Sequence, residues 1–333
     1  MKANPSRRRF LGAAATAFVA AGFSSAFSGV SAQASSRNGS SGHRLSKAVI
    51  TGPPSDEFCE HIKKTGFDGM EVTKWDAAIA EARQARQIVE KHDLSIHSVM
   101  RAWTNVNSPD KDKVAAEIES LKTAIRTAAA YGASAVLWVP CRVGGMKMPE
   151  AWDFDIDFDP NTLVVKSVAS GDNSAYQDYI AAQNYATESS IRAVEALIPT
   201  AAKEGVMIAL ENVWNNLWCT PEFFAAFIKS FDNPWVKCYF DLGNHTKYAR
   251  CEEWLKALGS SIVKLHIKDF AVREVQGKRG GGPGDWAAIG NGTIDWENVR
   301  KTLNEIRYHG WITVESGDRT DEEHSQFLDE YFG

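Results

Sequence analysis

The sequence has few cysteines and lacks the patterns that mark several classes of protein. Its five cysteines form no C-x-x-C pair and no zinc-finger spacing, which argues against a thiolate metal site. An odd number leaves at least one cysteine unpaired within the chain. Beyond the N-terminus there is no uncharged apolar run of about 18 residues, so we expect no membrane span in the mature protein.

Signals for nucleic-acid and nucleotide binding are also missing. The 333 residues carry a formal net charge of −5, which argues against nucleic acid as the main partner. No G-x-G-x-x-G follows the first expected strand, and the glycine-rich run at residues 280–284 lacks the Lys-Ser/Thr of a phosphate-binding loop. With 44% hydrophobic residues, the chain can form one large domain or two ordinary ones.

The N-terminus resembles a bacterial export signal. Ser6-Arg-Arg-Arg-Phe-Leu precedes an apolar stretch at residues 11–27, and Ala32-Gln-Ala34 is a small-x-small cleavage site. We therefore interpret residues 1–34 as a twin-arginine signal peptide and expect an exported, periplasmic protein. An uncleaved N-terminal anchor is the alternative. Residues 35–43 are rich in Ser and Gly and predict a flexible lead-in.

From residue 44 to residue 333, short apolar runs alternate with helix-like segments. Buried parallel strands read as apolar runs with little alternation, and strands separated by helices indicate a parallel sheet. The pattern predicts a single-domain α/β fold, a (β/α)₈ TIM barrel, with an open doubly wound sheet as the alternative. The expected strands are residues 45–51, 69–72, 94–100, 133–140, 206–210, 236–240, 262–265 and 310–315; the expected helices include 55–65, 77–91, 111–131, 181–202, 221–231, 251–258 and 321–331.

Four of these apolar runs end in side chains that can bind a metal. The runs end at Glu211, Asp241, His266 and Glu315. Because the carboxyl ends of parallel strands meet at one edge, these side chains should converge. Carboxylates with one imidazole suit a single divalent ion, with Mn²⁺ favoured and Mg²⁺, Co²⁺ or Zn²⁺ as alternatives. A single acid after a strand is more often a helix cap or a solvated loop residue, so the prediction depends on the whole set.

Two predicted loops are longer than a barrel requires. They span residues 143–176 after strand four and residues 270–292 after strand seven. Long loops at this end usually cover a substrate, although a mobile linker explains the glycine-rich run equally well.

Several segments carry a family resemblance that covers roughly residues 45–330. They resemble the sugar isomerase/epimerase group of xylose-isomerase-like barrels, which includes tagatose 3-epimerase and ketose-phosphate epimerases. The resemblance implies that Glu211, Asp241, His266 and Glu315 bind one divalent ion, and that Glu211 and Glu315 also transfer the substrate proton. The segments are Leu210-Glu-Asn, Phe240-Asp-Leu-Gly-Asn-His245, Leu265-His-Ile-Lys-Asp269, Gly290-Asn-Gly-Thr-Ile-Asp-Trp296 and Val314-Glu-Ser316.

The chain departs from that group at three places. The further acid expected six residues after the first ligand is Leu217. The histidine expected three residues after the ligand aspartate is Asn244, followed by His245. The arginine expected six residues after the ligand histidine is Val272, followed by Arg273. These differences weaken the assignment of a specific epimerase reaction more than they weaken the prediction of the metal site.

Seven residues are candidates for contact with the substrate. His97 lies in strand three and is equally suited to be a hydrogen-bonded core residue. Lys268 follows His266 by two and points to the same side if the strand continues; a solvated lysine is the alternative. Trp103, Trp214 and Trp286 fall in loops at the mouth, where indoles can stack on sugars or simply pack. The seven are His97, Trp103, Trp214, Asn244, His245, Lys268 and Arg273.

These observations favour a metal-dependent isomerase or epimerase that removes a proton beside the carbonyl of a keto-sugar and forms an enediolate. A lyase or hydrolase-type enzyme acting on 3-keto-glycosides would begin with the same step. A non-catalytic sugar-binding barrel is a third interpretation, which the presence of both glutamates disfavours. Because phosphorylated sugars are mainly cytosolic, the expected export favours an unphosphorylated substrate. The sequence leaves homo-oligomer formation open.

Overall fold

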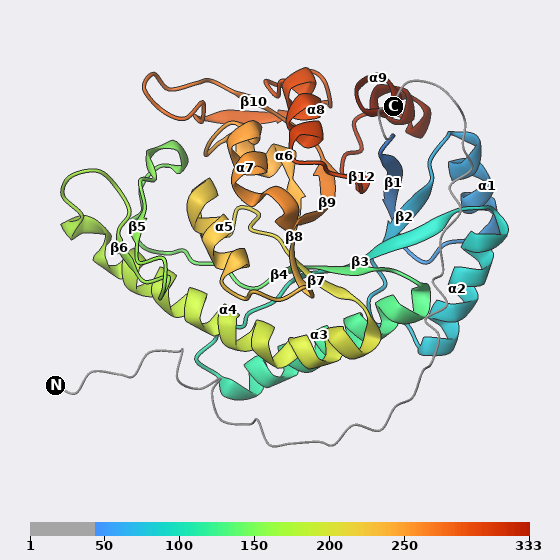
Figure 1. Cartoon of the computed structure of the whole chain (residues 1–333), viewed down its shortest axis with the longest axis horizontal. Coiled ribbons are helices and arrows are strands. Elements are labelled where there is room, and N and C mark those ends of the chain that lie inside the picture. Colours follow the sequence, from blue (N-terminus) through green and yellow to red (C-terminus); the bar gives the residue numbers. More distant parts are fainter. Residues whose placement is uncertain (1–43) are drawn as a thin grey trace, which may run out of the picture. The chain divides into compact units, whose positions relative to one another are not determined.

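The computed structural model describes residues 44–333 (Figure 1). The predicted signal peptide at residues 1–34 and the lead-in at residues 35–43 lie outside the described residues, so both stay predictions. Within the described part of the chain, no helix has the length and apolar character needed to cross a membrane.

Eight parallel strands close into a barrel in the order β1-β12-β9-β8-β7-β4-β3-β2. The predicted (β/α)₈ barrel is therefore confirmed and the open sheet is excluded. Most of these strands are buried along nearly their whole length, as their apolar sequences require. The barrel strands are β1 (Ser46–Thr51), β2 (Gly69–Val72), β3 (Ser95–Trp103), β4 (Ala135–Val139), β7 (Met207–Leu210), β8 (Val236–Asp241), β9 (Ile262–Ile267) and β12 (Trp311–Val314).

Helices surround the strands, and their ends follow local sequence signals (Figure 1). The Asp110 side chain caps α3 by accepting from the backbone N–H groups of Asp112 and Lys113, and α3 ends at Gly132, whose φ is 80°. Helix α8 was not located from the sequence. The long helices are α1 (Asp56–Lys64), α2 (Ile79–Lys91), α3 (Lys111–Tyr131), α4 (Gln177–Glu204), α5 (Pro221–Lys229), α7 (Cys251–Leu258), α8 (Trp296–Glu305) and α9 (Asp321–Phe332).

Both segments that were predicted as long loops contain secondary structure. The segment after β4 holds η2 (Ala151–Asp153), η3 (Ser174–Tyr176) and an antiparallel pair, β5 (Asp157–Phe158) with β6 (Val165–Ser167). After β9, strands β10 (Asp269–Val272) and β11 (Gly284–Ala287) pair antiparallel. A Cβ on Gly284 would lie 2.2 Å from the carbonyl oxygen of Ala271, so the glycine permits this close pairing.

The barrel interior has an apolar side and a polar side. Ala135, Leu137, Val139, Ala209 and Tyr239, from β4, β7 and β8, form a separate apolar cluster. Buried polar residues occupy the side formed by β2, β3, β9 and β12; they include Glu71, Ser98, His266 and Thr313. The short helices α6 (Leu242–Thr246) and η4 (Gly259–Ser261) complete the fold, and α6 directly follows β8 at the edge of the site.

Candidate metal centre

Three predicted ligands converge at the carboxyl ends of adjacent strands. Glu211 follows β7, Asp241 ends β8 and His266 lies near the end of β9. One ligand atom from each lies within 4.8 Å of those of the other two, and all three residues are buried. Among residues 44–333 this is the group whose mutual spacing suits a metal ion.

Glu315 approaches the same group from β12. Its Oε2 lies 2.9 Å from His266 Nδ1 and 3.0 Å from Lys268 Nζ. Its side chain is 32% exposed, whereas Asp241 is fully buried. Glu315 therefore lies where the centre opens toward solvent.

The orientation of these side chains fits a metal ion. Asp241 Oδ2, His266 Nδ1 and Glu315 Oε2 are buried, and their near neighbours are one another and the Lys268 ammonium. Carboxylates gathered this closely require positive charge between them, and a metal ion would engage all three atoms. Two carboxylates and one imidazole, together with Glu211, are a donor set for one divalent ion.

Glu71 fixes the orientation of His266. It lies in β2 with no exposed surface, and its Oε2 accepts a hydrogen bond of 2.7 Å from His266 Nε2. Its other oxygen accepts a hydrogen bond of 2.6 Å from Ser98 Oγ. With Nε2 engaged, the Nδ1 of a neutral imidazole keeps its lone pair for a metal. The sequence analysis missed Glu71; an acid inside an apolar strand was the available signal.

Asn244 holds two of the predicted ligands. Its side-chain amide donates to Glu211 Oε1 at 3.1 Å, and its backbone N–H donates to Asp241 Oδ1 at 2.6 Å. It was predicted to contact the substrate, and the structure brings it directly to the ligands. We infer that it orients Glu211.

The charged groups of the centre shift one another's pKa values. Burial raises the pKa of Glu211 to about 8 and that of Asp241 to about 7, although His266 and Lys268 act in the opposite direction. Burial would also raise the pKa of Glu315, but His266 and Lys268 together hold it below its ordinary value. Burial would lower the pKa of His266, but the carboxylates of Glu315 and Glu71 raise it well above the ordinary value. A metal must therefore displace protons to bind.

Lys268 lies at the centre and Trp286 lies beside it. The Lys268 ammonium is 3.4 Å from Asp241 Oδ2 and 5.1 Å from the centre of the half-exposed Trp286 ring. Trp286 stacks on Trp214 with ring centroids 4.9 Å apart. The Trp214 Nε1–H donates to the Asn244 carbonyl oxygen at 2.7 Å. These contacts connect the metal centre to the aromatic side chains of the mouth.

The structure places two of the predicted histidines away from the ligand atoms. His97 is buried inside the barrel, 3.0 Å from Thr313 Oγ1, and stacks on Trp311 at the amino end of β12. His245 points from α6 toward Phe240 and Trp254, and its Nδ1 lies 2.6 Å from the Asp241 carbonyl oxygen. Burial lowers the pKa of His245 to about 3, so it stays neutral.

Two further candidates lie on the surface of the mouth. Arg273 is 69% exposed and forms an ion pair of 3.1 Å with Asp285 across the β10–β11 hairpin. Trp103 is exposed at the end of β3, and the Arg142 guanidinium lies 5.9 Å from its ring centroid. Their contacts with a substrate stay predictions.

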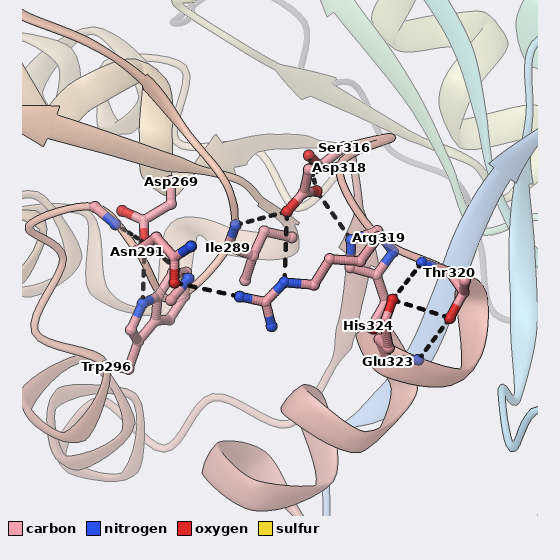
Figure 2. A network of polar contacts seen from close by, with 12 residues as sticks. Asp269, Ile289, Asn291, Trp296, Ser316, Asp318, Arg319, Thr320, Glu323 and His324 are labelled. Atoms are coloured by element: carbon pink, nitrogen blue, oxygen red, sulfur yellow. Dashed lines mark hydrogen bonds and ion pairs between the residues drawn. The ribbon is translucent and has the colours of Figure 1, made fainter.

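A neighbouring network supports the segments around the centre (Figure 2). Asp269 Oδ2 accepts from the backbone N–H groups of Gly290 and Gly292 at 2.9 and 3.0 Å and from Trp296 Nε1 at 3.3 Å. A Cβ on Gly292 would lie 2.0 Å from Asp269 Oδ1, so only glycine fits there. The Gly290–Trp296 motif found in the sequence therefore has a structural role.

Comparisons with known proteins agree with this fold. A family model described as a xylose isomerase-like TIM barrel matches residues 59–331. An uncharacterised protein of Methanocaldococcus jannaschii is 28% identical over 149 residues, which are 43% of this chain and 46% of that protein. The chain thus spans about half the length of the curated relative it matches.

Solved structures with low sequence identity share the fold. A D-tagatose 3-epimerase-like protein has a TM-score of 0.62 at 20% identity, covering 86% of this chain and 97% of that chain. The 3-keto-D-glucoside 4-epimerase YcjR of E. coli has a TM-score of 0.61 at 13% identity, with coverages of 86% and 100%. A D-psicose 3-epimerase has a TM-score of 0.59 at 13% identity, with coverages of 86% and 98%.

Proposed function

The chain belongs to the xylose isomerase-like TIM barrel family, and from this premise we propose that it is a divalent-metal-dependent isomerase or epimerase of an unphosphorylated keto-sugar. The observation that carries the proposal is the convergence of four possible ligands: atoms of Glu211, Asp241 and His266 lie within 4.8 Å of one another, and Glu315 Oε2 lies 2.9 Å from His266 Nδ1. Solved structures with this fold are named as a D-tagatose 3-epimerase-like protein, a 3-keto-D-glucoside 4-epimerase and a D-psicose 3-epimerase, and these names support the choice of a keto-sugar.

Glu211 and Glu315 are suited to act as the two bases. They follow β7 and β12, which are separated in the barrel by β8 and β9, so they approach the centre from different sides. A divalent ion held by Glu211, Asp241, His266 and Glu315 would polarise the substrate carbonyl and acidify the neighbouring C–H bond. One glutamate removes that proton from one face of the sugar, and the other returns a proton to the opposite face.

The surrounding residues fix this pair. Asn244 donates to Glu211, and Lys268 contacts Glu315 while presenting an ammonium that can bind a substrate oxygen. Glu71 keeps His266 in one tautomer. Mn²⁺ is the favoured ion, and Mg²⁺, Co²⁺ and Zn²⁺ remain compatible with oxygen and imidazole donors.

Incubation in deuterated water with ketohexoses and with 3-keto-glucosides tests the proposal. We expect deuterium at the carbon beside the carbonyl, a new isomer or epimer, and loss of both after metal removal with restoration by added Mn²⁺. Release of an aglycone in place of an epimer would assign the chain to the lyase alternative. If no keto-sugar exchanges its proton in the metal-loaded protein, the proposal is wrong.

A further inference from the structure

A cavity lies at the mouth of the barrel, beside the metal centre's aromatic neighbour Trp214. It has a volume of about 410 Å³ and lies between the segment after β4, the end of α6 and the β10–β11 hairpin. Aromatic side chains from all of these parts line it: Trp152, Phe154, Trp214, Tyr248 and Phe270. A cavity of this volume with an aromatic lining is typical of binding sites for planar organic groups.

The cavity contains an ammonium group without an ionic partner. Lys247 Nζ lies 3.8 Å from the Trp214 ring centroid and 5.0 Å from that of Tyr248. Within residues 44–333, no hydrogen bond or ion pair engages this group, although the exposed Glu150 also lines the cavity. Lys247 is half-buried, and burial lowers its pKa to about 8. An anionic oxygen would supply the missing partner.

The cavity is connected to the metal centre by neighbouring aromatic rings. Lys268, which contacts Glu315, lies against Trp286, and Trp286 stacks on Trp214. Trp214 in turn lines the cavity, and it follows Glu211 by only three residues. The stacked rings of Trp286 and Trp214 lie between Lys268 and Lys247, so a ligand bound at Lys268 would reach Lys247 by running along the edges of these rings. A free ketohexose at the metal centre would leave the cavity unused.

We propose that the substrate is a keto-glycoside whose aromatic aglycone occupies this cavity, with an acidic oxygen of the aglycone against Lys247. This inference rests on the proposed function, because the sugar ring would lie at the metal centre. The inference extends the proposed function by naming the chemical class of the group attached to the sugar, an aromatic aglycone. The aromatic side chains would bind the aglycone ring, and Lys247 would favour a carboxylate or phenolate substituent.

Binding of unoxidised glucosides tests the cavity without any turnover. We expect the phenyl glucoside to bind about tenfold more tightly than the methyl glucoside, and the 4-carboxyphenyl glucoside to bind more tightly still. Trp152→Ala should remove the advantage of both aryl compounds. Lys247→Met should remove only the advantage of the carboxylate. The control, Lys203→Met on the exposed end of α4, should change neither. Equal affinity for the methyl and aryl glucosides would overturn the inference.

Turnover separates this inference from the proposed function. We expect kcat/KM for deuterium exchange to be about tenfold higher for aryl than for methyl 3-keto-glucosides, and Trp152→Ala to abolish that ratio. Exchange at equal rates with all glycosides would overturn the cavity assignment and leave the proton-transfer function standing. Aryl-glucoside binding without exchange from any keto-sugar would do the reverse. Should Trp152→Ala fail to fold, Lys247→Met carries the test.

Discussion

Two groups of carboxylates at the same end of the barrel differ in how their oxygens are engaged. In the metal centre, the near neighbours of Asp241 Oδ2 and Glu315 Oε2 are charged groups: Lys268 Nζ lies 3.4 Å from the first and 3.0 Å from the second. In the adjacent network, Asp269 accepts four hydrogen bonds and Asp318 accepts from Ile289 N–H, Ser316 and His324 (Figure 2). We therefore propose that carboxylates facing charged groups bind the metal, whereas carboxylates that accept several hydrogen bonds stabilise the fold.

The pKa of Asp318 is shifted in the opposite direction from that of Asp241. Burial would raise its pKa, but hydrogen bonds from Ser316, His324 and Ile289 hold it below the ordinary value. Asp241 has one strong backbone donor, and burial raises its pKa to about 7. Burial also raises the pKa of Asp269. The kind of neighbour therefore distinguishes the two groups better than the direction of the pKa shift: charged groups surround the metal-centre oxygens, and several hydrogen-bond donors surround Asp269 and Asp318.

The largest expected effect comes from removing a base. Glu211→Gln keeps the side-chain volume and a hydrogen bond with Asn244 but cannot accept the substrate proton. We expect kcat for deuterium exchange to fall by about 10²–10⁴-fold. The unfolding midpoint in urea should change little. Glu188→Gln, on the exposed surface of α4, is the control and should keep full activity. An active Glu211→Gln enzyme would remove Glu211 from the proposed chemistry.

The next largest effect concerns stability, and it falls on the structural group. Asp269→Ala leaves the N–H groups of Gly290, Gly292 and Trp296 without an acceptor, and of these three residues only Trp296 is buried. A lost acceptor costs about 1–3 kcal/mol where water cannot replace it, which holds for Trp296, so we expect the free energy of unfolding to fall by about 1–3 kcal/mol. Urea denaturation measures it. Asp285→Ala on the exposed edge of β11 is the control, and an equal loss there would contradict the comparison.

The fold could be predicted in more detail than the site. Apolar strand sequences alternating with helices were enough to predict the barrel. The glycine-rich run at residues 280–284 predicts a loop because it lacks side chains that signal a strand, whereas the β10–β11 pairing depends on close backbone contact. The convergence of Glu211, Asp241 and His266 followed from strand ends alone.

The rest of the site depends on contacts that no local pattern encodes. Glu71 and His266 are 195 residues apart in the sequence and meet only across the barrel interior. Asn244 and His245 are adjacent, but the helical turn of α6 directs one toward Glu211 and the other toward Asn212. A one-residue difference on a helix changes the direction of the side chain by about 100°, so their roles could not be separated without the structure.

A smaller effect is expected from Glu71, because it contacts His266 and would influence the metal only through that residue. Glu71→Gln keeps an oxygen acceptor for one neighbour but removes the charge beside the imidazole. We expect the affinity for Mn²⁺ to fall about 10–100-fold, while the metal-saturated enzyme keeps most of its kcat. Isothermal titration measures the affinity. Unchanged Mn²⁺ binding would mean that Glu71 stabilises only the barrel interior.

Metal affinity should also depend on pH. In the metal-free centre the pKa values of Glu211 and Asp241 are raised to about 8 and about 7, so below pH 7 both carboxyl groups hold protons. A metal must displace these protons, and its affinity should therefore rise as the pH increases from 6 to 8. We expect a change of at least about tenfold, with proton release on binding. Affinity that is constant over this range would show that the carboxylates are already ionised.

The smallest effect is expected at Asp318, three residues after Glu315. Asp318→Asn keeps the acceptor for Ile289 N–H but removes the charge opposite His324 and Arg319. We expect a loss of about 1 kcal/mol in the free energy of unfolding, with Mn²⁺ affinity unchanged. Because folding lowers the pKa of Asp318, the wild-type carboxylate contributes stability above its unfolded pKa of about 3.9 and loses it as the pH falls through the folded value. The difference between variant and wild type should therefore shrink in acid, as urea melts at pH 7 and pH 3 can measure. A variant that loses Mn²⁺ instead of stability would place Asp318 in the metal centre, and the division between the two carboxylate groups would fail.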